Sequence, residues 1–554
     1  MKKTRKILSI LFIGIGLLVT SSCETTNLDL TENPNALPLN AADPDLLLDG
    51  VQVDFAYAME DFGRAGSEVT RLSYMFGRSY ANAYGPTFFN ESWRLSYQRV
   101  MKNIQVMNVL AKEKNFKKHL AMGKVFEAYT LITLVDFFGD VPYTQALDVT
   151  NLAPKADKGA DVYAKAIILL DEAIADFGVA GGIVPKNDFY YKKDWNKWIR
   201  LANTIKMKIL IQQRLVNTGA ITSFNAIVTS NNFIKAGEDF EFNWGITNTN
   251  PDSRHPQYID AYTTTGVGII GFYQANWLMN EMINGKSVAD PRLRYYFYRQ
   301  QNSVPISEQL LRCSVEPSPP NHYATGGHVY CIIPNNNGYW GRDHGNDEGI
   351  PPDTQRRTAP GVYPAGGKFD GNEFVAINTL SMGAKGYGIT PILLSSTVDF
   401  WRAEAALFGG AGSAKTHMQN GAQASITKVR GFISRDATAI TSFAPATSVD
   451  AAYLAAIGTK YDAATTNATR LDVIITEMFI SLYGNGIDAY NAYRRTGSPS
   501  NIQPNVELTP GAFIRSFWYP ANEANTNPNI PQKANVAVQV FWDNNPATGF
   551  LKGN

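Results

Sequence analysis

Candidate metal ligands gather near the middle of the chain. Histidine and cysteine occur there within 23 residues, at His322, His328, Cys331 and His344. Imidazole and thiolate are common zinc ligands, but no two of these residues have the close spacing of a structural zinc site. Carboxylates that could bind calcium lie nearby, at Asp343, Asp347, Glu348 and Asp353. They do not follow the helix-loop-helix calcium pattern, so we favour a solvated loop and expect no bound metal.

Motifs for covalent or phosphate chemistry are missing from the sequence. It contains no H-E-x-x-H, no G-x-S-x-G and no G-x-x-x-x-G-K-[ST]. Gly383, Gly386 and Gly388 are spaced too irregularly for a dinucleotide site. A carboxylate pair for glycoside hydrolysis is defined by its separation in space, so the sequence leaves that alternative open. We expect no catalytic residue and no cofactor.

Aromatic residues beside small polar groups are better candidates for binding. Tyr80 and Tyr84 lie among Ser79, Asn82 and Gly85, and the same combination recurs at residues 339–343. A flat ring can stack on the apolar face of a sugar, while amides and hydroxyls meet its hydroxyl groups. The predicted ligand contacts are Tyr80, Asn82, Tyr84, Tyr339, Trp340, Arg342 and Asp343. The alternative is that these aromatic residues only anchor their own loops.

A neighbouring aromatic group has a different spacing. Gly85-Pro86 interrupts any helix, and beyond it Phe89, Trp93 and Tyr97 recur at every fourth residue. That spacing places the three rings on one helical face. We therefore expect them to pack in the core.

Helical periodicity dominates the elements that must position these residues. Apolar residues of segment 162–177 fall on one face, at Val162, Ala166, Leu169, Leu170, Ala173 and Phe177. Asp43-Pro44 resembles an N-cap followed by a first-turn proline. Further helices are predicted at 120–138, 195–216, 398–408 and 471–483. Helix pairs of this kind look like tetratricopeptide units, although the 34-residue consensus is not visible.

An irregular region is expected at about 235–395, where Gly, Pro, Asn and Asp are frequent. At its centre, 12 of the 34 residues in 338–371 are Gly or Pro, so neither helix nor sheet can persist. A loop of this length is usually functional or disordered. Its aromatic residues need partners to pack against, which argues against disorder.

The N-terminus has the features of an export signal. A basic head precedes the apolar run 7–19, which is too short to span a membrane. Ser21, Ser22 and Cys23 then match the cleavage site of a bacterial lipoprotein, with Thr20 where leucine is usual. We predict a signal peptide (1–22), lipidation at Cys23 and a flexible polar tether (23–42). The alternative is an ordinary signal peptide followed by an incidental cysteine.

Composition favours a large globular domain over 43–554. Hydrophobic residues make up 44% and charged residues 18% of the chain, and a net charge of +1 gives no sign of a nucleic-acid partner. Export would allow Cys313 and Cys331 to form a disulfide, and we favour this pairing over two free thiols.

Eight short motifs carry a resemblance to one family along almost the whole chain. In order, they are LDLTENPN after Cys23, FFGDVPYTQAL (137–147), WIRLANTIKMKIL (198–210), DPRLRYYF (290–297), FWRAEAALFGG (400–410), AYRRTGSPS (492–500), FWYPANEANTN (517–527) and FWD (541–543). The chain resembles the SusD/RagB-like nutrient-binding outer-membrane lipoproteins of Bacteroidetes, in particular a divergent SusD-like group. Trp518 departs from the smaller or polar residue that is frequent there. We expect Glu404 and Arg494-Arg495, within these motifs, to make structural hydrogen bonds.

The resemblance implies a mainly α-helical fold with four tetratricopeptide-like helix pairs and a variable binding face from the irregular region. It further implies a lipid-anchored protein of the outer membrane that faces outward. Such a protein captures oligosaccharides and delivers them, as a lid, to a SusC-like TonB-dependent barrel without breaking a bond. The alternative ligand is a peptide, which we favour less because of the Tyr- and Trp-rich loops.

Overall fold

The computed structural model describes residues 42–268, 272–349 and 351–551. The predicted signal peptide, the lipidation site Cys23 and the tether up to residue 41 lie outside them. Within the described residues, no helix is both long and apolar enough to cross a membrane. From Pro44 onward the chain forms one compact unit.

Long helices build the first part of this unit, and their ends follow the sequence signals. Helix α2 (Pro44–Val69) begins at the predicted proline, and α6 (Lys117–Phe138) ends before Gly139, which has a φ of 84°. Helix α7 (Gly159–Gly178) buries all six residues of the predicted apolar face. The other helices here are α3 (Tyr80–Ala83), α4 (Asn90–Arg94), the π-helix η2 (Leu95–Met101), α5 (Lys102–Glu113), α8 (Trp195–Gln212) and α9 (Ala220–Ser230).

A second helical part follows the irregular region. It contains α14 (Ser395–Ala406), α15 (Ala414–Gly431), η4 (Phe432–Arg435), η5 (Thr441–Phe443), α16 (Thr447–Ala463), α17 (Asn467–Ser481), α18 (Gly486–Thr496) and α19 (Ala521–Thr526). The Thr466 side chain caps α17 through a capping box with Thr469. The helices predicted at 398–408 and 471–483 are confirmed by α14 and α17.

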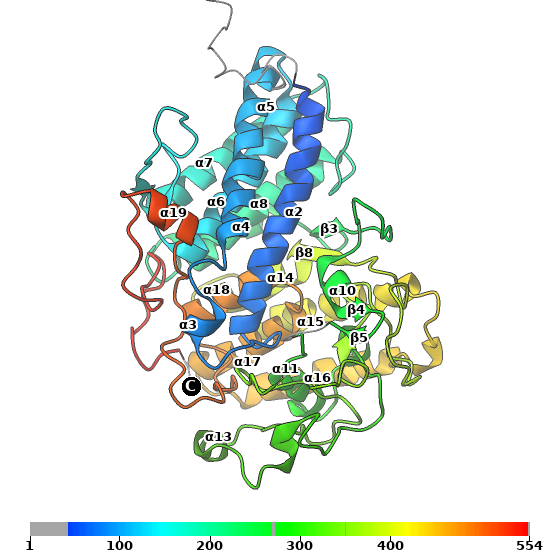
Figure 1. Cartoon of the computed structure of the whole chain (residues 1–554). Coiled ribbons are helices and arrows are strands. Elements are labelled where there is room, and N and C mark those ends of the chain that lie inside the picture. Colours follow the sequence, from blue (N-terminus) through cyan, green and yellow to red (C-terminus); the bar gives the residue numbers. More distant parts are fainter. Residues whose placement is uncertain (1–41, 269–271, 350, 552–554) are drawn as a thin grey trace, which may run out of the picture. The chain divides into compact units, whose positions relative to one another are not determined.

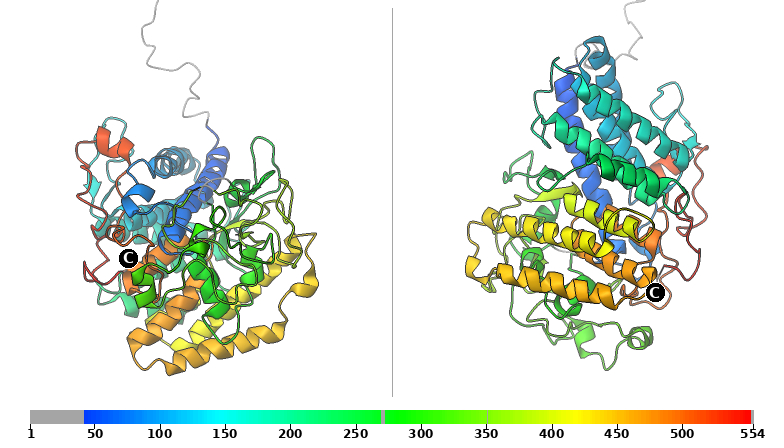
Figure 2. Two further views of the ribbon diagram at one scale, coloured as in Figure 1. Left: turned by 60° about the horizontal axis from the view of Figure 1, so that its bottom comes forward. Right: turned by 180° about the vertical axis from the view of Figure 1, so that it is seen from behind.

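Consecutive helices pack against one another in pairs. Helix α6 packs on α7 and α7 on α8, and in the second part α14 packs on α15 and α15 on α16 and α17. Figure 1 and the rear view of Figure 2 show α14–α17 lying side by side. Helix α18 packs on α2 and so joins the two parts around a continuous core, in which Phe89, Trp93 and Tyr97 are also buried, as predicted. The fold is mainly α-helical and tetratricopeptide-like, as expected.

Short elements fill the region between the two helical parts. Its longest described helix is α11 (Asn276–Asn284), and β3 (Phe240–Asn243) pairs antiparallel with β8 (Ile389–Leu393). The remaining elements are α10 (Pro256–Ala261), β4 (Tyr262–Thr263), β5 (Gly266–Val267), α12 (Leu293–Tyr296), β6 (Phe297–Tyr298), η3 (Arg312–Val315), α13 (Asn321–Gly326) and β7 (Ala359–Pro360). A separate two-residue pair, β1 (Val141–Pro142) and β2 (Ala156–Asp157), follows α6. The rings of Tyr363 and Phe369 are buried, so the central loop packs as an ordered part of the core.

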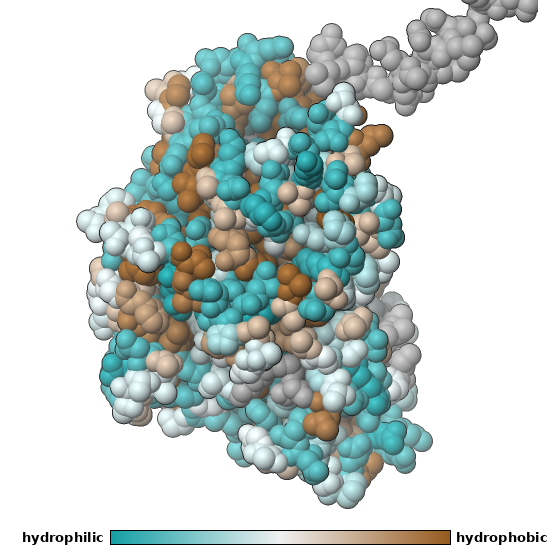
Figure 3. All heavy atoms as spheres, turned by 90° about the vertical axis from the view of Figure 1, so that its left-hand side faces the viewer, coloured by the Kyte–Doolittle hydropathy of each residue, from teal (hydrophilic) through white to brown (hydrophobic). Residues whose placement is uncertain are grey.

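Hydrophobic side chains are dispersed on the face drawn in Figure 3. They lie there in small groups separated by hydrophilic residues. The described residues of this face therefore present no broad apolar surface of the kind that marks an obligate partner.

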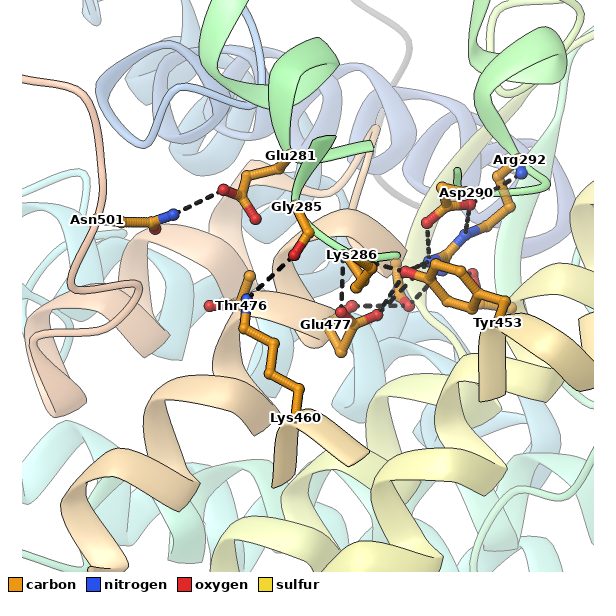
Figure 4. A network of polar contacts seen from close by, with 12 residues as sticks. Glu281, Gly285, Lys286, Asp290, Arg292, Tyr453, Lys460, Thr476, Glu477 and Asn501 are labelled. Carbon is orange, nitrogen blue, oxygen red and sulfur yellow. Dashed lines mark hydrogen bonds and ion pairs between the residues drawn. The ribbon is translucent and has the colours of Figure 1, made fainter. Parts of the chain in front are cut away.

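A buried network of charges fixes the irregular region to the second helical part (Figure 4). Lys286, just after α11, lies 2.8 Å from Glu477 on α17, and Tyr453 on α16 donates to the same carboxylate at 2.7 Å. Next to them Arg292 binds Asp290 through Nε and Nη2, at 2.9 and 2.6 Å. Because a charge buried without its partner is costly, the network sets the position of this region on the helices.

Candidate functional site

The structure corrects most of the predicted ligand contacts. Six of the seven side chains are buried, namely Tyr80, Tyr84, Tyr339, Trp340, Arg342 and Asp343. A ring that stacks on a sugar must expose one face, so none of the four aromatic residues offers a platform. Only Asn82 is exposed.

Tyr80 and Tyr84 attach the short helix α3 to the body of the protein. The Tyr84 hydroxyl donates to Glu68 at 2.8 Å, and its ring meets Phe517 edge-on at 5.5 Å. The Tyr80 hydroxyl accepts from Arg71 at 3.3 Å. These contacts match the alternative in which the aromatic residues anchor their loops.

Residues 339–343 have the same structural role. Trp340 is fully buried in a cluster with Tyr74, Tyr273 and Leu311. The Arg342 guanidinium lies 4.4 Å from the centroid of the Tyr273 ring. Asp343 accepts from Asn276 at 3.0 Å, from Gln503 at 2.7 Å and from the Cys331 amide at 2.7 Å. Tyr339 donates to Asp370 at 2.6 Å.

The two cysteines of this region form a disulfide. Cys313 and Cys331 are bonded, and both lie in the cluster that surrounds Trp340. Nearby, His344 is buried, and burial lowers its pKa well below the usual value. Among the described residues, no three His, Cys, Asp or Glu side chains are arranged to hold a metal ion.

A large cavity lies beside α2, and we call it cavity A. Its volume is about 720 Å³, within the range of ligand-binding pockets. One wall is α2, and the others come from residues 72–83, from α10 and from residues 272–274. Asn82 is the one predicted contact that lines it.

Carboxylates dominate the charged lining of cavity A. Five carboxylates face one guanidinium, namely Glu60, Asp61, Glu68, Asp260 and Asp347 against Arg64. Glu60, Arg64 and Glu68 follow at intervals of four residues, so they share one face of α2. The lining therefore carries more carboxyl groups than guanidinium groups.

Burial shifts four acids of this lining toward their neutral forms, namely Glu60, Asp61, Glu68 and Asp260. It raises the pKa of Glu60 to about 7, although Thr390 donates to that carboxylate at 2.7 Å. Burial also raises the pKa of Asp61 to about 6 and the pKa values of Glu68 and Asp260. A protonated carboxyl group can donate a hydrogen bond as well as accept one. Near neutral pH, cavity A can therefore donate hydrogen bonds to the hydroxyl groups of a ligand and accept hydrogen bonds from them.

Rings complete the lining. Phe76 is 44% exposed and borders cavity A together with Phe88 and Phe272. The Arg64 guanidinium lies 5.8 Å from the centroid of the Phe88 ring. An exposed ring beside carboxyl groups, an amide and a guanidinium is the combination that was predicted at Tyr80 and Trp340, but it is built here from other residues. The four-residue spacing of Glu60, Arg64 and Glu68, which places them on one face of α2, was the sequence signal for it.

Comparisons with known proteins agree with the fold. Residues 42–307 match a family model described as starch-binding and associating with the outer membrane, and residues 378–548 match one described as SusD and RagB outer membrane lipoprotein. No curated protein matches the chain.

Solved structures cover nearly the whole chain. A chitin-binding protein is 21% identical with a TM-score of 0.62, and a chitin-binding SusD homologue from Flavobacterium johnsoniae is 18% identical with a TM-score of 0.61. A SusD/RagB family protein from Bacteroides thetaiotaomicron is 18% identical with a TM-score of 0.63. Each comparison covers 91% of this chain and 100% of the other.

Proposed function

Because the chain belongs to the SusD/RagB-like family of outer-membrane lipoproteins, we propose that it captures oligosaccharides at the cell surface and passes them to a TonB-dependent, SusC-like barrel. In this role the protein is a lid that binds and releases its ligand without breaking a bond. Two similar structures are of chitin-binding proteins, which favours a glycan.

Cavity A is the observation that supports this function best. It combines the exposed ring of Phe76, which suits the apolar face of a pyranose, with carboxyl, amide and guanidinium groups that suit its hydroxyls. Its volume of about 720 Å³ is sufficient for a short oligosaccharide.

Calorimetry on the full-length protein in detergent tests the proposal. The ligands are chitin-derived, starch-derived and other neutral oligosaccharides. Each is titrated into the parent protein and into two variants of cavity A, Asp260→Asn and Gln257→Ala. We expect heat of binding for at least one glycan and a weaker affinity in both variants. No heat with any glycan would contradict the glycan function.

A peptide is the second candidate ligand, and the charge of cavity A favours it. The five carboxyl groups of cavity A outnumber its one guanidinium, and the ionised ones suit lysine- or arginine-containing peptides. The same calorimetry with basic and acidic peptides of equal length separates the two functions. Binding of basic peptides without binding of any glycan would establish the peptide function.

Membrane attachment through Cys23 is a separate part of the proposal. We expect Cys23→Ser to leave ligand affinity unchanged and to release the protein from the outer membrane, because acyl chains alone would hold it there. Fractionation of cells that express each form measures this. Co-purification of a large barrel with the membrane-bound form tests the partner.

A further inference from the structure

A second cavity, which we call cavity B, lies in the irregular region and shares no lining residue with cavity A. Its volume is about 590 Å³. Residues 289–302, 337–339 and 372–374 line it, together with Pro445 and Val449. Its charged lining is opposite to that of cavity A, with Arg294 and Arg299 against Asp290.

Arg299 is fully engaged by the protein. Its Nε and Nη2 bind Asp370 at 2.6 and 3.1 Å, its Nη1 donates to the Asn337 carbonyl at 2.6 Å, and Nη2 also donates to Asn372. Asp370 in turn accepts from Tyr339. This group holds the wall of cavity B and leaves little of Arg299 for a ligand.

Arg294 donates its hydrogen bonds within the protein through one nitrogen only, and its guanidinium also lies 5.7 Å from the centroid of the Phe443 ring. Its Nη1 donates to the Asp370 carbonyl and to the Asn372 side chain, each at 2.9 Å, and lies 3.6 Å from an Asp370 carboxylate oxygen. Its Nε and Nη2 have no hydrogen-bond partner among the described residues, and the side chain is 25% exposed. These two atoms form the edge of a guanidinium that binds a carboxylate, sulfate or phosphate through two parallel hydrogen bonds.

Neighbouring carboxylates are already paired, so they do not compete for this edge. Asp290 is bound on both oxygens by Arg292, and Glu373 lies 2.7 Å from Lys368. Asp370 carries the pair with Arg299 and is fully buried. The positive charge of Arg294 is therefore the one that cavity B presents to solvent among its described lining residues.

The backbone around cavity B is held in unusual conformations. Asn337, Asn372 and Phe374 all line it with positive φ, at 50°, 61° and 53°. A left-handed phenylalanine is rare, and such strain gathers at ligand sites. The exposed amides of Asn302 and Asn337 lie in the same lining and can meet hydroxyl groups.

We propose that cavity B is a second binding site, in which the Nε–Nη2 edge of Arg294 binds the oxyanion of an acidic saccharide, a carboxylate or an ester sulfate. The asparagine amides of the lining bind the hydroxyls of the same sugar. Arg294 is prepared for this contact because its Nη1 bonds fix the guanidinium before the ligand arrives.

The test compares acidic and neutralised forms of one ligand on the full-length protein in detergent. Trigalacturonate and its methyl ester have the same sugar chain, but esterification removes the negative charge of the carboxyl groups, and a sulfated disaccharide supplies the other oxyanion. We expect one of the acidic saccharides to bind at least tenfold more tightly than its uncharged counterpart and to lose that advantage in Arg294→Gln. Arg402→Gln is the matched control, because its side chain is also 25% exposed and ion-paired.

Further measurements locate the binding site and identify the kind of anion that it binds. Asp260→Asn in cavity A should leave the acidic ligand's affinity unchanged, which separates failure of this site from failure of the proposed function. If inorganic sulfate competes with the acidic saccharide and binds as tightly as it does, cavity B is a site for free anions. That result would overturn the proposal that its ligand is a saccharide. Equal affinity for acid and ester, no binding of either acidic saccharide, or an unchanged affinity in Arg294→Gln would overturn the site.

Discussion

Lys286 Nζ lies 2.8 Å from Glu477 Oε1, and both side chains are almost completely buried. This pair connects the irregular region, which contributes to both cavities, to helix α17. Lys286→Met should lower the free energy of unfolding by about 3–5 kcal/mol, because it leaves Glu477 buried without its partner. Urea denaturation of the variant and the parent measures the difference.

A double-mutant cycle separates the pair from general packing. Lys286→Met combined with Glu477→Leu should recover much of the lost stability, since removing both charges also removes their desolvation cost. The exposed pair Lys415–Asp462 is the control, and Lys415→Met should cost less than about 1 kcal/mol. Additive losses in the double variant would refute the coupling.

Glu404 supplies a prediction for acid pH. Burial opposes its ionisation, but Arg495 and Arg214 lower the pKa of this carboxyl from 4.5 to about 2. Its folded pKa lies below the unfolded value, so the stabilisation is present above about pH 4.5 and is lost as the pH falls toward 2. Between pH 6 and pH 3 the parent should lose about 2 kcal/mol relative to Glu404→Gln.

Urea denaturation of the parent and of Glu404→Gln at each pH gives the difference between their free energies of unfolding. The titration of the other acids is common to both proteins and cancels in this difference. Glu404→Gln should be less stable than the parent at pH 6, because Arg495 then lacks a buried counter-charge. A stability difference that stays constant from pH 6 to pH 3 would rule out the lowered pKa.

Local patterns predicted the helices, but not which polar side chains are buried. The apolar face of α7 repeats with the helical period, so the sequence contains the information that places it. Glu404 and Arg495 within the family motifs were also expected to make structural bonds, and they do. Tyr84 shows the limit of local sequence patterns. The small polar residues around it in the sequence do not reveal whether its ring faces solvent or packs on Phe517, as it does.

The candidate site is formed by contacts between residues that are far apart in the sequence. Glu60, Arg64 and Glu68 are placed on one face of α2 by their spacing alone. That this face borders a cavity depends on α10 and residues 272–274, which are remote from α2 in the sequence. Periodicity carries no information about that approach.

Removal of the disulfide should destabilise the region around Trp340. The bond between Cys313 and Cys331 closes a loop with a sequence separation of 18. Restricting that loop in the unfolded chain stabilises the protein by about 3 kcal/mol, so the double variant Cys313→Ser/Cys331→Ser should lose this amount. Denaturation with and without reducing agent measures it. The reduced parent should match the double variant, and a parent indifferent to reduction would contradict the expectation.

Phe76 and Trp340 should respond in opposite ways to replacement by alanine. Phe76 is 44% exposed and borders cavity A, so Phe76→Ala should weaken ligand binding by about 1–3 kcal/mol if the ring is a central contact. Its stability should change by less than about 0.5 kcal/mol. Trp340 is fully buried, so Trp340→Ala should cost about 3–5 kcal/mol of stability, the reverse of what its sequence environment suggested.

Calorimetry with the glycan or peptide that binds cavity A, together with denaturation curves, measures both effects. Phe189→Ala is the matched control, because this ring is 40% exposed and lies outside the lining of cavity A. It should leave affinity and stability close to those of the parent. If Phe76→Ala binds as tightly as the parent, the ring does not contact the ligand. If Trp340→Ala binds the ligand more weakly but is as stable as the parent, Trp340 contacts the ligand and is not buried when the ligand binds.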